Sequence, residues 1–254
     1  MYFLEELKYR NEVLYYFGLV CLVFAVACLV LSWLIPTQVL GTNAWYKPFK
    51  FFLSTTIFVW SMAWYLHYLN SPMAVLAYSL GMVVLFTIED VYVLVQAARG
   101  LTSHFNTTSS FYSRMWTLMA GAAVGISLWT LVVSLPFFMR CFPDLPLAYL
   151  WGIRFGLIIF VIFSLQGMVM GARMAHTVGA ADGTPGVPVL NWSKVNGDLR
   201  AAHFWGMHAL QALPLLGFYL LRNTYWLVSV SILYMAFCIL IFFQALAGKP
   251  FIKL

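Results

Sequence analysis

Seven long apolar runs dominate this chain of 254 residues. The runs cover Glu12–Pro36, Pro48–Leu69, Pro72–Gln96, Phe111–Phe138, Leu147–Gly171, Leu199–Leu221 and Tyr225–Leu246. Each contains the roughly 20 apolar residues that a helix needs to cross a bilayer core of about 30 Å. Only 9% of the residues are charged and 63% are hydrophobic, and no water-soluble fold can bury that much apolar surface. The sequence therefore predicts an all-α polytopic membrane protein, a bundle of seven transmembrane helices.

One such bundle accounts for residues 1–254 and leaves no soluble domain. We expect the first run to be retained, because it is too long for a signal-peptide core and no Ala-x-Ala type of cleavage site follows it. The net charge of +6 comes from cations scattered over the run ends, which indicates topogenic charge and no nucleic-acid partner. Residues 177–196 form the one long connection, rich in Gly and Pro, and we expect a functional loop or lid there.

The distribution of Lys and Arg predicts how the chain crosses an inner (cytoplasmic) membrane. The side that holds the N-terminus has fewer Lys and Arg residues than the other side: Lys8, Arg10, Arg140 and Arg222. The positive-inside rule then places the N-terminus outside and the C-terminus in the cytoplasm. If five cations of the other side serve a binding site, the remaining charges divide evenly and the rule no longer decides.

The polar exceptions gather at one predicted membrane face. They are Lys47, Lys50, Glu89, Gln96, Arg99, His104, Gln166, Arg173, His176, Arg200, His203, His208 and Gln211. Residues seven apart share one face of a helix, so several of them form polar stripes within apolar runs. Polar groups in hydrocarbon are costly unless paired, so these stripes should face the bundle interior or a wet cavity.

The deepest acids are Glu89 and Asp90, which are adjacent and so point in different directions. Glu89 is in register with Gln96 and is the better candidate to enter a site directly. As a functional group it would carry a proton, ligate a metal ion or pair with one of the arginines. The structural alternative is a buried acid that ties helices together.

Four of the five histidines belong to this face. His104, His176, His203 and His208 are candidate metal ligands, for zinc or iron, through neutral imidazole nitrogens. Alternatively, two histidines on different helices could bind the iron of a haem b, and the cations of this face would then hold the haem propionates. The spacing of five between His203 and His208 does not suit one ion, and interfacial histidines bonded to backbone carbonyls are the structural alternative.

The cations of this face also have two interpretations. Lys47, Lys50, Arg99, Arg173 and Arg200 could bind an anionic small molecule or lipid headgroup, since arginine matches such groups bidentately. The alternative is snorkelling of long side chains to the membrane surface. Snorkelling explains the two lysines more easily than the arginines that stand among other polar residues.

Several segments resemble uncharacterised bacterial multi-pass membrane proteins. They are Lys47-Pro48-x-Lys50-Phe51, Gln96-Ala97-x-Arg99-Gly100-x-x-Ser103-His104-Phe105-Asn106 and Gly197-Asp198-Leu199-Arg200-x-x-His203-Phe204 through His208-Ala209-Leu210-Gln211. The resemblance implies a bacterial source and no particular activity. The closely spaced histidine pair of ceramidase-like zinc hydrolases is absent, and the last run lacks the lysine of a rhodopsin.

Three functions from different classes fit these residues. The first is a haem- or metal-dependent redox or membrane enzyme, with His104, His203 and His208 at the cofactor and Arg99, Arg173, Arg200 and Gln211 around the substrate. The second is a proton-coupled transporter of a small anion, with Glu89 as the protonated group. The third is a structural or assembly subunit of a membrane complex. The sequence favours the first, because the histidines and the long loop suit a capped site.

Overall fold

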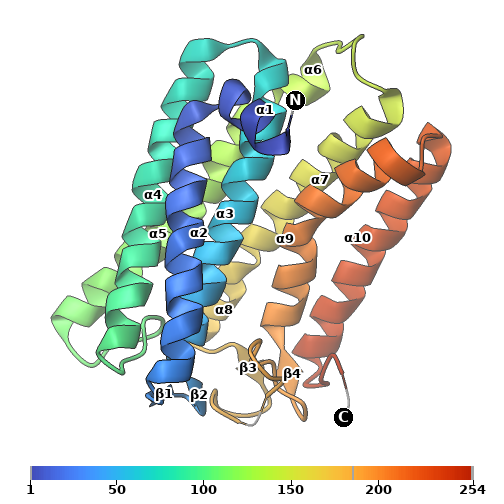
Figure 1. Cartoon of the computed structure of the whole chain (residues 1–254). Coiled ribbons are helices and arrows are strands. Elements are labelled where there is room, and N and C mark those ends of the chain that lie inside the picture. Colours follow the sequence, from blue (N-terminus) through green and yellow to red (C-terminus); the bar gives the residue numbers. More distant parts are fainter. Residues whose placement is uncertain (1, 185, 253–254) are drawn as a thin grey trace. The chain divides into compact units, whose positions relative to one another are not determined.

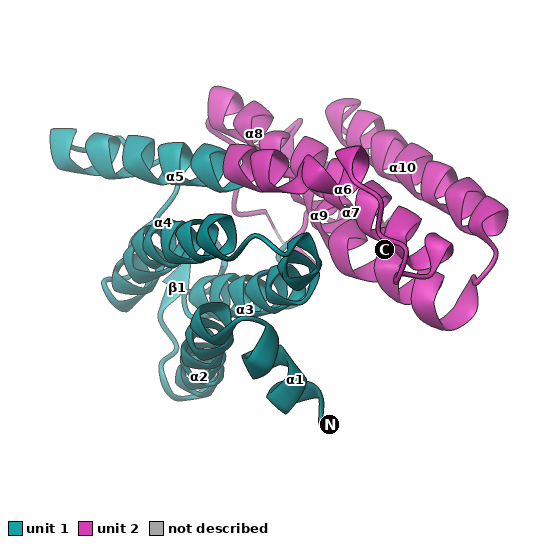
Figure 2. Cartoon of the chain, turned by 90° about the horizontal axis from the view of Figure 1, so that it is seen from above, with its two compact units in different colours: residues 1–126, 188–191 teal, residues 127–187, 192–254 magenta. Residues whose placement is uncertain are grey.

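The chain is mostly helical in the computed structural model, which describes residues 2–184 and 186–252 (Figure 1). Its contacts divide it into two compact units, coloured separately in Figure 2, and each unit is described by itself. Unit 1 comprises residues 1–126 and 188–191. Unit 2 comprises residues 127–187 and 192–254.

Unit 1 is built from helices joined by connections of different lengths. Its elements are α1 (Phe3–Arg10), α2 (Glu12–Leu34), β1 (Gln38–Val39), β2 (Thr42–Asn43), α3 (Tyr46–Leu66), a 3₁₀ turn (His67–Leu69), α4 (Pro72–Ala98) and the first part of α5 (Ser110–Ser134). The strands β1 and β2 pair antiparallel across the turn between α2 and α3. Pro72 stands in the first turn of α4, where its missing donor costs nothing, and Gly100 follows that helix with φ +67°.

A stripe of small residues lets α2 approach α3 closely. The buried positions of α2 are Leu14, Gly18, Cys21, Ala25, Cys28 and Ser32. A Cβ at Gly18 would clash with the Trp60 indole ring, so a larger residue at this position would force the ring to move. Close approach through small residues is how helices associate where lipid provides no hydrophobic drive. Cys21 and Cys28 are free, buried thiols and serve as two of these small packing residues.

Unit 2 contains the rest of the helices and the long loop. Its elements are the end of α5, α6 (Pro136–Met139), α7 (Leu147–Leu165), α8 (Gly167–Arg173), β3 (Thr177–Val178), β4 (Gly197–Asp198), α9 (Leu199–Leu215), a π-helix (Leu216–Leu220) and α10 (Thr224–Leu246). The antiparallel pair β3–β4 closes the long loop at its two ends. Pro214 lies inside α9, and the α-helical pattern gives way to the π-helix two residues later.

Helices α7 and α9 pack antiparallel through glycines. A Cβ at Gly152 would meet the Leu213 carbonyl oxygen at 2.6 Å, and one at Gly156 would meet the Ala209 carbonyl oxygen at 2.9 Å. On the other helix, a Cβ at Gly217 would lie 2.7 Å from the Ala148 carbonyl oxygen. The two backbones are therefore in contact along the interface, as expected of helices with glycines four residues apart.

Five helical segments of the described residues are long and apolar enough to span a membrane. They are Glu12–Leu34, Pro72–Ala98, Ser110–Met139, Leu147–Arg173 and Thr224–Leu246. The other two predicted runs are helical as well, but α9 has 17 residues before its π-helix, and α3 begins with two lysines and carries several polar residues. The helical membrane class is supported, whereas the count of seven spanning helices stays a prediction.

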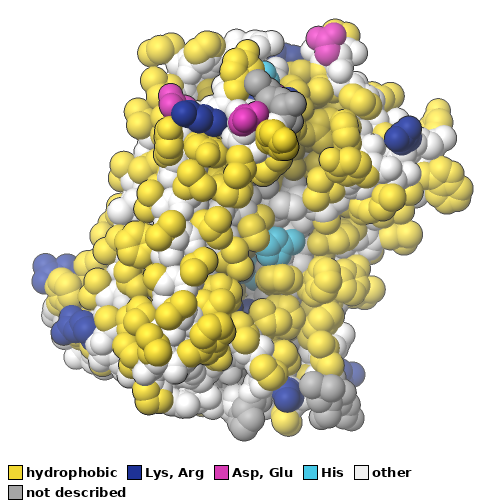
Figure 3. Space-filling model, in the orientation of Figure 1, with side chains coloured by type: hydrophobic (Ala, Val, Ile, Leu, Met, Phe, Trp, Pro, Cys, Tyr) yellow, Lys and Arg dark blue, Asp and Glu magenta, His cyan; other side chains and the backbone are white. Residues whose placement is uncertain are grey.

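Hydrophobic side chains cover most of the visible surface, and charged ones lie toward its ends (Figure 3). The exposed large hydrophobic residues of α2 include Val20, Val23, Val26 and Val30. On α10 they include Leu233, Leu240 and Phe243. Such exposed apolar helix faces are explained by contact with lipid rather than water.

Candidate functional site

In unit 2, the start of α9 lies beside the end of α10 and the β3–β4 pair. A Cβ at Gly197 would lie 1.9 Å from the Ala245 carbonyl oxygen, so β4 approaches the α10 backbone as only glycine allows. Asp198 then caps α9 by accepting from the Arg200 amide at 3.0 Å. It also accepts from the Ser193 amide at 2.8 Å. Asp198 is therefore the N-cap of α9, and the same side chain binds the end of the long loop through Ser193.

The guanidinium of Arg200 forms an ion pair with Asp198. Its Nε and Nη2 atoms donate to the two carboxylate oxygens at 2.9 Å and 2.6 Å. This bidentate geometry is the strongest that arginine makes with a carboxylate, and Asp198 is 1% exposed. Arg200 therefore balances a buried acid, and Arg173, exposed at the end of α8, is the more accessible arginine for an anion.

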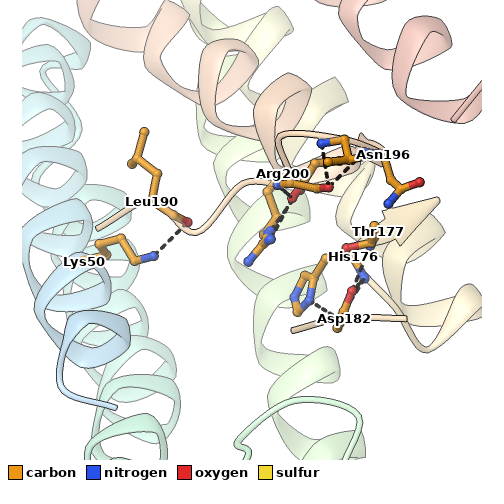
Figure 4. A network of polar contacts seen from close by, with 10 residues as sticks. Lys50, His176, Thr177, Asp182, Leu190, Asn196 and Arg200 are labelled. Carbon is orange, nitrogen blue, oxygen red and sulfur yellow. Dashed lines mark hydrogen bonds and ion pairs between the residues drawn. The ribbon is translucent and has the colours of Figure 1, made fainter. Parts of the chain in front are cut away.

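His176 and Asp182 form a second pair at the start of the loop (Figure 4). The imidazole Nδ1 lies 2.7 Å from the Asp182 carboxylate, which also accepts from the His176 and Thr177 amides. Burial acts to raise the pKa of Asp182, but these hydrogen bonds and the His176 charge lower the pKa below its ordinary value of 3.8. Asp182 is not among the site residues predicted from the sequence.

On α9, His203 and His208 are each oriented through Nδ1. His203 Nδ1 lies 2.7 Å from the Phe163 carbonyl oxygen, which can only accept, so Nδ1 carries the proton. The neutral ring then keeps a lone pair on Nε2. His208 Nδ1 lies 3.2 Å from the Gln211 amide oxygen. His203 is also within electrostatic range of His176 and His208. Unit 2 thus brings three of the four predicted histidines together.

Gln166 adds a polar group to the same region. It stands at the junction of α7 and α8, is 8% exposed, and neither its amide oxygen nor its nitrogen has a hydrogen-bond partner among the described residues. The next residue, Gly167, packs against His203, since a Cβ there would lie 3.5 Å from the ring. A buried amide without partners is costly, and such groups commonly mark a ligand site.

The other predicted residues belong to unit 1. Lys50 Nζ donates to the Leu190 carbonyl oxygen at 3.1 Å, so this lysine holds the middle of the loop (Figure 4). Lys47 is partly buried one turn earlier on α3. Arg99 ends α4 and lies over the Tyr112 ring at 6.0 Å. The contacts of Lys50 and Arg99 therefore stabilise unit 1 locally. An anion-binding site formed by these cations stays a hypothesis.

His104 lies in an aromatic environment. Its Nδ1 is 3.2 Å from the Ser103 hydroxyl, and its ring packs against Phe51 and Trp116 at centroid distances of 5.6 Å and 5.3 Å. Gln96 is fully buried nearby in the chain, where its amide donates to the Tyr92 hydroxyl at 3.1 Å. Unit 1 therefore brings the start of α3 and the end of α4 together, as predicted for this face.

The acid that unit 1 buries completely is Asp90. It is 2% exposed, whereas Glu89, which the helical register favours, is partly buried. Both Asp90 oxygens lack a hydrogen-bond partner among the described residues. Asp90 is rotated by about 100° around α4 from Glu89, and only the packing of α2 and α3 shows which of the two directions is buried.

No group of three or more His, Cys, Asp and Glu side chains in residues 2–184 and 186–252 is arranged to hold a metal ion. The structure therefore does not support the predicted metal site, in which three or four of the side chains of His104, His176, His203 and His208 would bind one ion. A haem iron needs only one or two imidazoles and is not subject to this test.

Comparisons with known proteins do not add a function. No family model, curated protein or solved structure matches this chain.

Proposed function

We propose that this chain is a bacterial inner-membrane protein that binds a redox cofactor, haem b in the first instance, through histidines of unit 2. The observation that carries the proposal is the hydrogen bond from His203 Nδ1 to the Phe163 carbonyl oxygen at 2.7 Å. Histidines that ligate iron or zinc donate their other ring N–H to a carbonyl or carboxylate, which fixes the ring and directs its lone pair. His203 has this arrangement inside an apolar helix.

Three further features support a cofactor at this place. His176, paired with Asp182, and His208, paired with Gln211, are also oriented by a hydrogen bond, so either could be a second histidine that holds the cofactor. Gln166 supplies a buried amide without partners beside the glycine that packs on His203. Arg173 is exposed and suits a propionate or an anionic lipid headgroup, because Arg200 is paired with Asp198.

The proposed activity is electron transfer or oxidation–reduction at the membrane, with the N-terminus outside and the C-terminus in the cytoplasm. The first experiment is a reduced-minus-oxidised visible spectrum of the detergent-purified protein. We expect a Soret band with α and β bands, and a loss of haem content of about tenfold or more in His203→Ala, since this variant lacks the histidine that would hold the haem.

His67→Ala is the matched control, because this histidine ends α3 in unit 1 and is not a proposed ligand. Its spectrum should equal that of the wild type. A featureless spectrum from folded protein expressed with excess haem excludes the haem version. If elemental analysis also finds no metal that depends on His203, the whole proposal is wrong, and the transporter or structural-subunit alternatives take its place.

A further inference from the structure

Unit 1 holds a buried titratable group that the proposed cofactor site does not use. Asp90 lies eight residues before the end of α4, about 12 Å into the helix at about 1.5 Å per residue. Because α4 is one of the segments apolar enough to span a membrane, this depth places the carboxyl within the hydrocarbon layer. Asp90 is 2% exposed, so lipid and water are both excluded from it.

Among residues 2–184 and 186–252, no cationic side chain forms an ion pair with Asp90. Neither carboxyl oxygen has a hydrogen bond or an ion pair within the described part of the chain. The groups that act on it are the thiols of Cys21 and Cys28 on α2, Thr55 on α3, and Glu89 beside it on α4. Thr55 is a neutral hydroxyl that is 3% exposed and lies near enough to the carboxyl to act on it.

An ionised carboxylate in such a place is very unfavourable. Moving an unpaired charge out of water costs several kcal/mol or more, even after relaxation, and thiols and one hydroxyl offer little compensation. The neutral acid lacks this cost. The packing of α2 against α3 and α4 therefore favours the state in which Asp90 carries a proton.

We infer that Asp90 is a proton-binding site in the interior of unit 1. It holds a proton while α2, α3 and α4 are packed, and its O–H bond breaks when these helices separate enough to admit water, which takes the proton and hydrates the carboxylate. A residue of this kind is what a proton-coupled membrane protein needs. The inference concerns unit 1 alone and does not depend on the cofactor proposed in unit 2.

The test is infrared spectroscopy of the full chain in liposomes of neutral lipid, which detects the C=O stretch of a protonated carboxylic acid without any reagent entering the core. We compare Glu89→Gln with the wild type at neutral pH in sodium-free and potassium-free buffer. We expect the protonated-acid band in both proteins, shifted in D₂O, and its loss in Asp90→Asn. Asn has the shape of the neutral acid, so this variant should keep the wild-type melting temperature.

Three results would each overturn the inference. The first is no protonated-acid band in folded Glu89→Gln at neutral pH, a measurement that does not require Asp90→Asn to fold. The second is a band that survives in Asp90→Asn and disappears in Glu89→Gln, which identifies Glu89 as the proton carrier. The third is a band that disappears when sodium or potassium is added, which makes the site one for a monovalent metal cation.

Discussion

In unit 2, the hydrogen-bond partner of each histidine influences the tautomer and the charge state of its ring. A histidine beside a carbonyl, such as His203, has its tautomer imposed by the acceptor. A histidine beside a carboxylate, such as His176, also gains a partner for its charged form. The Asp182 pair therefore makes the fold around the loop sensitive to acid.

We predict an acid-induced opening of the segment 174–199. The hydrogen bonds and charge of His176 lower the pKa of Asp182, so this carboxylate stabilises the folded segment fully above pH 3.8, the ordinary value. The stabilisation is lost as the pH falls below 3.8 through the lower folded-state pKa. Pepsin digestion followed by mass spectrometry, normalised to an unstructured peptide, should show cleavage in this segment rising several-fold as the pH falls.

Asp182→Asn provides the comparison for that experiment. It should be cleaved readily at all pH values in the acid range, because the amide is not titrated there. Equal acid sensitivity in both proteins would show that another group controls the loop.

Helices in this chain associate through backbone contact rather than large side chains. In unit 2 the glycines of α7 face the α9 backbone, including the residue before Pro214. In unit 1 the small residues of α2 serve the same purpose against α3. Interfaces of this type tolerate little added volume, because backbone atoms cannot move aside as a side chain can.

We predict that Gly152→Ala destabilises the protein by about 1–3 kcal/mol, the usual cost of overpacking. The new methyl carbon would lie 2.6 Å from the Leu213 carbonyl oxygen and 2.8 Å from the Pro214 Cα. Gly121→Ala on α5 is the matched control, since nothing lies within 4 Å of its added Cβ. Thermal unfolding in detergent should show a lower midpoint for the first variant and an unchanged or slightly higher one for the second. Equal midpoints would contradict the α7–α9 contact.

Over the whole molecule, the cysteines report which surfaces are accessible. Cys21, Cys28 and Cys238 are buried, and Cys141 is exposed just after α6. Under the proposed orientation, the connection that contains Cys141 shares the outer side with the N-terminus.

We predict that a membrane-impermeant maleimide labels Cys141 in cells whose outer membrane is permeabilised. Cys141→Ser should abolish this labelling, and alkylation after denaturation should count the remaining thiols. Labelling only in inverted inner-membrane vesicles would show that the orientation is the reverse of the predicted one. The cations at the predicted site would then lie on the outer side and would not act as topogenic charges.

Much of the architecture could be predicted from local sequence. The apolar runs, the Pro and Gly residues at helix ends and the Asp198 cap depend on neighbours within a few residues, and α4 starts at Pro72 as predicted. The same local pattern predicts Leu199–Leu221 as one uninterrupted helix and does not mark where α9 changes to a π-helix after Pro214.

The sequence by itself determined a helical membrane class and the set of polar residues at its helix ends, because hydrophobicity and turn chemistry are local properties. The tertiary structure alone decided their partners. The acceptor for His203 is a backbone carbonyl 40 residues away, and Asp90 rather than Glu89 faces the interior because α2 and α3 pack on that side of α4. Burial and pairing are set by contacts between distant segments, and no periodicity within one helix contains them.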